Sequence, residues 1–133
     1  MPQPPASLLD LARRYTAAWC SQNPASVAAF YSPDGSLRIN GGAAAVGRSA
    51  IADVAQEFMT AFPDMQVLMD DLVIQNGLPR FHWTLIGANT GPGGTGRRVR
   101  ISGFEEWKIG ADGLIAESLG TFDNADYQRQ LAG

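Results

Sequence analysis

One aspartate near the end of the chain has surroundings suited to acid–base chemistry. Strand alternation places Asp123 on one face with Ile115, Glu117, Leu119 and Thr121. Because Ile115 and Leu119 are apolar, this face is predicted to point inward. An aspartate at the mouth of an apolar cavity is suited to general acid–base catalysis. Asp123 also directly precedes a predicted helix, so it could serve as the N-cap, and the two roles are compatible.

Glu105 is a second carboxylate on an alternating segment. It shares a face with Ile101, Gly103, Trp107 and Ile109. If that face points inward, Glu105 is buried and can contact a ligand. The favoured interpretation is plainer: a carboxylate at a strand edge, paired with an arginine.

The single histidine and the single cysteine are weaker candidates. Histidine titrates near neutral pH, but alternation with Trp83 and Leu85 predicts that His82 lies on the opposite sheet face. Cys20 has no base beside it in sequence, so a buried thiol is expected. One histidine and one cysteine make a structural zinc site implausible, and neither a metal nor a cofactor is predicted.

Large apolar side chains could line a pocket for a flat apolar ligand. They are Tyr15, Trp19, Phe58, Met59, Phe62, Met65 and Trp83. Most such residues simply form a core, so only a minority is expected to contact a ligand. The glycine-rich run 91–96 formally matches a dinucleotide-binding fingerprint, but a strand pattern rather than a helix follows it. We therefore interpret this run as a flexible hairpin loop.

Helical periodicity dominates the first half of the chain. A first helix is expected to open at Ser7, with Asp10 completing a capping box. Asn23–Pro24 is a typical start for a second helix. A third follows residues 47–49, and its apolar face carries Ile51, Val54, Ala55, Phe58 and Phe62.

Strand patterns dominate the second half. The predicted runs are 65–74, 80–89, 97–109 and 114–122, with a hairpin turn at Asn76–Gly77 and a closing helix over 125–131. Earlier, residues 33–35 predict a turn before a short strand over 36–40. Helices first and antiparallel strands afterwards predict an α+β fold. A strongly curved sheet with helices on its concave face would leave a cone whose open end suits a ligand.

Composition indicates one globular domain over residues 1–133, with 1–6 as a loose lead-in. The net charge of −3, without a basic stripe, argues against nucleic acid as a partner. No apolar run approaches the length of a membrane span, and the first residues lack the features of a signal peptide. Together with the lone cysteine, these features predict a cytoplasmic protein.

Short motifs occur in a characteristic order along the chain. Gly87-Ala88-Asn89-Thr90-Gly91 ends one predicted strand, and Ile101-Ser102-Gly103-Phe104-Glu105 lies within the next. Asp112-Gly113-Leu114-Ile115 forms a turn, and Gln130-Leu131-Ala132-Gly133 ends the chain after Asp123. The helical half adds residues 47–51 and 62–64. Together these motifs resemble the SnoaL-like polyketide cyclases of the nuclear transport factor 2-like superfamily, over nearly the whole chain.

The resemblance implies a cystatin-like cone and an enzyme for an apolar, polyketide-like carbonyl substrate, which it would cyclise or isomerise without a cofactor. The family's catalytic aspartate before the last helix matches Asp123. The histidine of its Gly-Xaa-His-Xaa-Gly motif falls on Asn89, and an asparagine of its first strand matches Asn40. Because asparagine donates and accepts hydrogen bonds but does not exchange protons near neutral pH, Asn89 and Asn40 are expected to hold the substrate oxygen.

Two other reactions known on this fold remain open. Epoxide hydrolysis would use a carboxylate–arginine–carboxylate array, for which Arg38, Arg80 and Arg100 are available. Steroid isomerisation would need a carboxylate near the first strand, where residues 37–40 offer none.

A different class, a module that only binds an apolar ligand or dimerises, is favoured by the absence of the family histidine. A cavity of a few hundred cubic ångströms facing Asp123 and Asn89 would favour an enzyme or a carrier, and a filled cone would favour a scaffold. The resemblance also implies a homodimer formed through the outer sheet face, where Ser102, Phe104 and Glu106 are expected.

Overall fold

Two amphipathic helices of 14 residues form most of the helical layer in the computed structural model, which describes residues 3–133. Helix α1 (Ala6–Trp19) buries one stripe at helical spacing, namely Leu11, Ala12, Tyr15, Ala18 and Trp19. Helix α3 (Arg48–Ala61) buries Ile51, Ala55 and Met59. Between them lies the short α2 (Pro24–Ala28), where the predicted cap is confirmed: the Asn23 side chain accepts a hydrogen bond from the Ala25 amide.

The start of α1 differs from the prediction. The helix begins at Ala6, and its N-cap is Pro5, which has no side-chain hydrogen bond to offer. The Pro5 carbonyl accepts from the amides of Leu8 and Leu9, so the first turn forms without the predicted capping box. Asp10 instead pairs with Arg14 on the exposed face. Of the predicted lead-in, residues 1 and 2 lie outside the described residues, and residue 6 is already helical.

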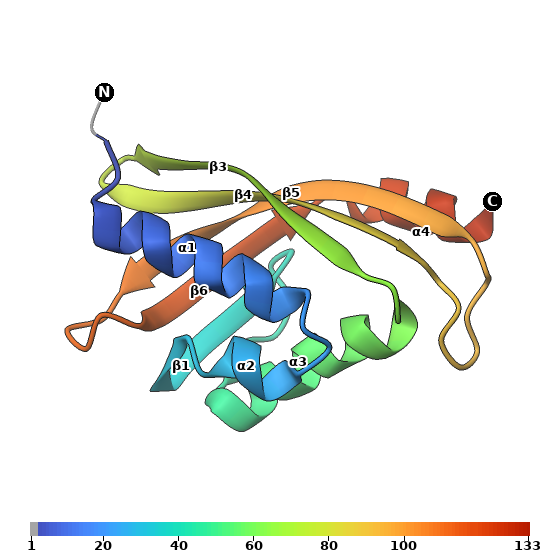
Figure 1. Cartoon of the computed structure of the whole chain (residues 1–133), viewed down its shortest axis with the longest axis horizontal. Helices are drawn as coiled ribbons and strands as arrows, with labels where there is room; N and C mark the ends of the chain where they lie inside the picture. Colours follow the sequence, from blue (N-terminus) through green and yellow to red (C-terminus); the bar gives the residue numbers. More distant parts are fainter. Residues whose placement is uncertain (1–2) are drawn as a thin grey trace.

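A six-stranded sheet carries the rest of the fold, and the expected α+β class is confirmed (Figure 1). Its strands are β1 (Tyr31–Ile39), β2 (Ala45–Val46), β3 (Gln66–Gln75), β4 (Leu78–Ala88), β5 (Arg98–Ile109) and β6 (Ile115–Phe122). Their order is β2-β1-β6-β5-β4-β3, antiparallel throughout except for the parallel pair β1–β6. Asn76 and Gly77 both have positive φ, as expected of the predicted hairpin turn between β3 and β4.

Strand β1 is longer than predicted. Residues 33–35, predicted as a turn, lie within it, and its register against β6 shifts between Tyr31 and Ser36. Gly35 permits this irregularity, because a Cβ there would lie 2.9 Å from the Ile115 carbonyl oxygen. The two-residue strand β2 was not predicted, since its sequence of small residues has no alternating pattern.

The inward face of β6 is also different from the prediction. Pairing with β5 slips by one residue at Ala116, because Lys108 faces Glu117 while Ile109 faces Ile115. Such a bulge reverses the alternation that follows it. Ser118 and Gly120 are therefore buried, whereas Leu119 is exposed. The predicted inward set from Glu117 to Asp123 is thus wrong beyond Ile115.

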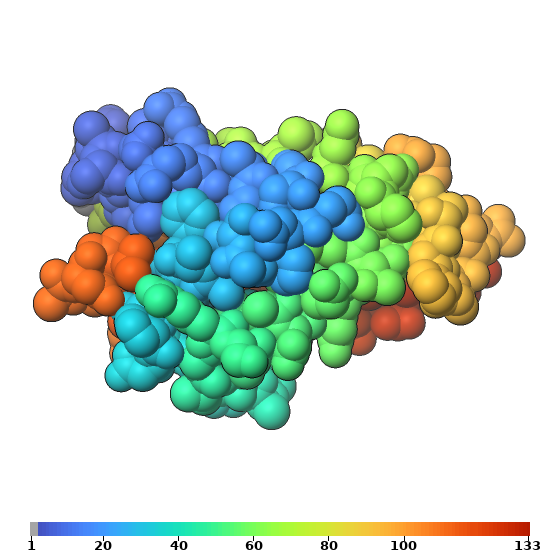
Figure 2. Space-filling view, turned by 60° about the horizontal axis from the view of Figure 1, so that its bottom comes forward, coloured from blue at the N-terminus to red at the C-terminus, as the bar shows by residue number. Residues whose placement is uncertain are grey.

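The helices and the sheet enclose the core between them. Viewed from the helical side, α1, α2 and α3 form a continuous layer (Figure 2). The last helix, α4 (Asn124–Ala132), packs against β5 at the far end of the sheet (Figure 1). On the outer sheet face, pairing places His82 opposite Phe104, and their rings are 5.7 Å apart, as alternation predicted. The homodimer through this face stays a prediction. Within residues 3–133, no helix is both long and apolar enough to cross a bilayer.

Candidate functional site

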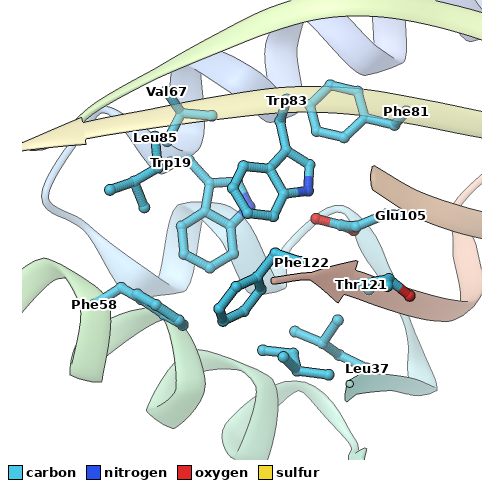
Figure 3. Close-up of a pocket in the computed structure, with 12 residues that line it drawn as sticks. Trp19, Leu37, Phe58, Val67, Phe81, Trp83, Leu85, Glu105, Thr121 and Phe122 are labelled. Carbon is cyan, nitrogen blue, oxygen red and sulfur yellow. The ribbon is translucent and has the colours of Figure 1, made fainter. Parts of the chain in front are cut away.

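A cavity lies between the concave face of the sheet and the helices (Figure 3). Its walls are Trp19, Leu37, Ile39, Phe58, Val67, Phe81, Trp83, Leu85, Glu105, Gly120, Thr121 and Phe122. Among the described residues, only Glu105 brings a polar side chain other than the indole nitrogens, because the side chain of Thr121 is exposed on the other side of the strand. The cavity volume is about 60 Å³. At roughly 10–15 Å³ per water molecule, that is space for roughly four to six waters, well below the roughly 300–1,000 Å³ typical of ligand pockets.

Among residues 3–133, Glu105 is the only ionisable residue in the cavity wall, and four side chains hold it. Its Oε1 accepts hydrogen bonds from Ser118 Oγ at 2.7 Å and from Trp107 Nε1 at 3.0 Å. The Tyr15 hydroxyl lies 3.0 Å from Oε1 and 3.2 Å from Oε2, and the Tyr31 hydroxyl lies 3.5 Å from Oε1. Most of these bonds converge on Oε1, so Oε2 keeps acceptor capacity for a ligand.

The fold supplies these four donors from separate elements. Tyr15 comes from α1 and Tyr31 from the start of β1. Trp107 lies two residues along the same inward face of β5, and Ser118 lies on the adjacent β6. All four are completely buried. Because the donors are fixed by the core, the carboxylate is held in one orientation.

The electrostatics of this cluster follow from its burial. Removal from water raises the pKa of the Glu105 carboxyl above its ordinary value, and the hydrogen bonds it accepts offset only part of that effect. Burial and then the charge of Glu105 raise the pKa of both tyrosines well above the usual value. The tyrosine hydroxyls therefore remain protonated donors while Glu105 changes its protonation state.

The ion pair predicted for Glu105 belongs to its neighbour. Glu106 points to the outer face, where its Oε2 accepts from Arg80 Nε at 3.1 Å. Arg38 is exposed and donates to the Gly42 carbonyl, and Arg100 is exposed as well. None of these arginines lines the cavity, so the array for epoxide hydrolysis is not assembled there. Among residues 3–133, no three His, Cys, Asp or Glu side chains converge as metal ligands would.

Four of the predicted ligand-contact residues line the cavity: Trp19, Phe58, Trp83 and Glu105. The other two aromatic candidates lie behind its wall. Tyr15 is completely buried and reaches the cavity only through its bond to Glu105. Phe62 is also completely buried and packs against Tyr127 of α4. Both are core residues, as most of the aromatic set was expected to be.

The three residues expected to act at the mouth have other roles in this structure, and none lines the cavity. Asp123 is exposed and caps α4, accepting from the Asp126 amide at 3.0 Å. Asn40 is exposed, and its Oδ1 accepts from the Phe122 amide. Asn89 donates to the Ala61 carbonyl and accepts from the Thr95 amide, which fastens the glycine-rich loop to the end of α3.

Several wall residues had no signal strong enough for the sequence to single them out. Gly120 and Phe122 face the cavity because of the Ala116 bulge, which strand alternation does not reveal. Ser118 meets Glu105 for the same reason. Trp107 was placed on the Glu105 face by alternation, but a donor two residues away on one strand was not recognised as its partner.

Solved structures with the same fold come from several bacteria. A protein of ketosteroid isomerase-like fold from Catenulispora acidiphila is 14% identical, with a TM-score of 0.79 over 92% of each chain. TsrD from Streptomyces laurentii is 22% identical, with a TM-score of 0.80 over 98% of each chain. A SnoaL-like protein from Jannaschia sp. CCS1 is 14% identical, with a TM-score of 0.83 over 100% of this chain and 98% of that one. These likenesses establish a nuclear transport factor 2-like fold.

The family follows from the sequence match. The family model of the SnoaL-like polyketide cyclases matches residues 9–131. The chain therefore belongs to the SnoaL-like polyketide cyclase family, as the motif resemblance indicated. No curated protein matches the chain in sequence.

Proposed function

We propose that the chain is an enzyme that cyclises or isomerises a small apolar carbonyl compound, with Glu105 rather than Asp123 as the group that moves the proton. The observation that carries this proposal is a single buried carboxylate in the wall of an otherwise apolar cavity. An apolar lining with few polar groups is the usual composition of a small-molecule site, here at a smaller volume than is typical.

The chemistry follows from the environment of Glu105. A carboxylate whose pKa is raised by burial is a stronger base toward a weakly acidic proton, such as one on the carbon next to a carbonyl. Glu105 Oε2 would take that proton and return it at another carbon in an isomerisation. In a ring closure, the carbanion would attack a second carbonyl, and the proton would pass to the new alkoxide oxygen.

Hydrogen exchange tests this proposal before any natural substrate is known. A ketone with removable α-protons is incubated with the protein in D₂O, and deuterium entry at the α-carbon is followed by NMR. We expect the wild type to accelerate exchange and Glu105→Gln to return it to the uncatalysed rate. Glutamine keeps the shape and an acceptor oxygen but loses the basic carboxylate. Glu106→Gln, one residue away on the outer face, is the matched control and should retain full exchange.

A second candidate, binding without catalysis, is favoured by one observation. Three side chains already satisfy Oε1 at 3.0 Å or less, as in a purely structural polar cluster. Under this alternative, ketones bind to the wild type but their exchange rate is the same as with Glu105→Gln. That outcome would contradict the catalytic proposal.

A further inference from the structure

Two indole nitrogens lie beside the carboxylate in the cavity wall. Trp19 and Trp83 both line the cavity, and the close-up draws their nitrogens on the side where Glu105 lies (Figure 3). Neither nitrogen forms a hydrogen bond within residues 3–133. The third indole, that of Trp107, already donates to Glu105. The cavity wall therefore includes two indoles whose N–H groups have no acceptor among the described residues, and that of Trp19 is shielded from the open space.

Trp19 carries the stronger of the two signals. It is only 8% exposed, and its Nε1 is buried without any partner, the one such side-chain atom among the described residues. The Tyr15 hydroxyl is close enough for the indole to offset slightly the rise that burial causes in the pKa of Tyr15, but the two groups do not meet the geometry of a hydrogen bond. Buried donors are nearly always satisfied in folded proteins, so an orphan in a cavity wall indicates an acceptor that the chain does not supply.

The position of the Trp83 ring depends on the residue opposite it, which is a glycine. Its partner across the β4–β5 pair is Gly103, and a Cβ at that position would lie 2.7 Å from Trp83 Cζ2. The indole thus lies directly over the β5 backbone, and its edge packs against Phe122. This contact turns the ring so that its nitrogen faces the Glu105 carboxylate (Figure 3).

The chemistry of the wall restricts what could accept these hydrogen bonds. Within the part of the chain that the structure describes, no lysine, arginine or histidine lines the cavity, so an anionic ligand would meet Glu105 without any compensating cation. An uncharged acceptor on an apolar body fits all of these surroundings, and a carbonyl oxygen has two lone pairs for two donors.

We infer that the indole N–H groups of Trp19 and Trp83 form a donor pair that holds the carbonyl oxygen of an uncharged ligand on the Glu105 side of the cavity. The inference rests on the proposed function for the class of ligand and adds the groups that bind its oxygen. In the proposed reaction, the same two donors would face the oxygen as it gains negative charge. Because Trp19 Nε1 is shielded, the Trp19 ring must shift slightly as the ligand enters.

Indole signals in ¹H–¹⁵N spectra test the pair directly. The chain has three tryptophans, so Trp19→Phe and Trp83→Phe assign all three signals. The probes are cyclohexanone and methylenecyclohexane, which have nearly the same shape and differ in the C=O group. Methyl signals of Val67 and Leu85 report occupancy of the cavity by either probe. We expect cyclohexanone to move the Trp19 and Trp83 indole protons downfield, and methylenecyclohexane to move only the methyl signals.

Affinity gives a second measurement. Loss of one hydrogen bond in Trp83→Phe should weaken cyclohexanone binding about two- to tenfold and leave methylenecyclohexane nearly unchanged. Equal indole shifts with both probes, or methyl shifts with cyclohexanone but no indole shift, would overturn the donor pair. Failure of cyclohexanone to move the Val67 and Leu85 signals would also overturn it.

The same spectra separate this inference from the proposed reaction. They involve no turnover, so the donor pair survives even if Glu105→Gln and the wild type exchange α-protons equally. Conversely, if exchange depends on Glu105 but no indole signal shifts, the proposed reaction is supported and the donor pair is wrong.

Discussion

Glu105 and Glu106 are adjacent on β5, yet they occupy opposite environments. Glu105 faces inward and is held by neutral donors, namely two tyrosines, a tryptophan and a serine. Glu106 faces outward and is paired with Arg80 in partial contact with water. Burial raises the pKa of the inner carboxyl, and its neutral donors offset only part of that effect, so its proton can be exchanged with a substrate. The face of the strand, rather than the residue type, therefore determines whether a carboxylate can do chemistry.

The largest expected difference between the two faces is in packing. Phe62→Ala should lower the free energy of unfolding by about 3–5 kcal/mol, because Phe62 is completely buried among the inner side chains. Phe104→Ala on the half-buried outer face is the matched control and should cost clearly less. Urea unfolding of both variants measures the difference. Equal losses would mean that the outer face is covered as thoroughly as the core, as in a stable dimer.

The stability of the polar cluster around Glu105 should depend on whether the substituted side chain can still accept hydrogen bonds. Glu105→Leu leaves Trp107 Nε1 and Ser118 Oγ without their acceptor, at a cost of about 1–3 kcal/mol for each unsatisfied buried group. Glu105→Gln keeps an acceptor and should stay close to the wild type at mildly acidic pH. Denaturant unfolding compares the two variants. If Glu105→Leu were as stable as Glu105→Gln, the four donors would not be organised around the carboxylate.

The pH dependence of stability should reflect the inner carboxylate. The pKa of Glu105 is raised in the folded state, so its contribution to stability is fully present below the unfolded pKa and is lost as pH rises through the folded pKa. Glu105→Gln removes this loss. Thermal unfolding at a series of pH values should therefore show Glu105→Gln gaining on the wild type as pH rises above about 4.3, the ordinary glutamate pKa. The absence of a gain in Glu105→Gln would contradict the assignment.

Substitutions at Asp123 should have a smaller effect on stability, and they test directly whether Asp123 or Glu105 moves the proton. As the N-cap of α4 it should contribute about 1 kcal/mol, so Asp123→Ala lowers unfolding stability by that amount while Asp123→Asn costs little. Neither variant should change ketone exchange, because Asp123 is exposed and outside the cavity wall. Loss of exchange in Asp123→Asn would instead support the role predicted from the sequence.

The smallest effect is expected at the outer ion pair. Arg80→Met should change stability by less than about 1 kcal/mol, because both charges remain partly exposed and screened. Arg80 also lies over the Phe104 ring, and methionine preserves much of that apolar contact. Unfolding at low and high salt measures the electrostatic part. A loss of stability comparable to that of Glu105→Leu would contradict the expected difference between the inner and outer faces of β5.

The fold could be predicted from sequence because its signals are periodic and local. The apolar stripe of α1, the Asn23 cap and the Asn76–Gly77 turn each indicate one element, and all three are present. Alternation from Ile101 to Trp107 is uninterrupted and grouped Glu105 with these residues on one face of β5, but the favoured interpretation of Glu105 was an arginine-paired residue at a strand edge.

The site was predicted only where it depends on such patterns. The inward position of Glu105 follows from alternation, but its four donors come from α1, β1, β5 and β6 and are brought together by tertiary packing. Asp123 illustrates the opposite error. Its position matched a family motif, and strand alternation predicted that its face of β6 points inward. One unpaired residue earlier in β6 reverses that face in the structure.

That unpaired residue, Ala116, allows β6 to differ in length without any change in the cavity wall. Without Ala116, β6 would pair with β5 in unbroken register, and Ser118 would follow Ile115 by two positions. Ser118 and Gly120 would therefore keep their inward side, and Glu117 and Leu119 would stay outside. A one-residue deletion in evolution could thereby straighten the strand and leave every residue that faces the enclosed space in place.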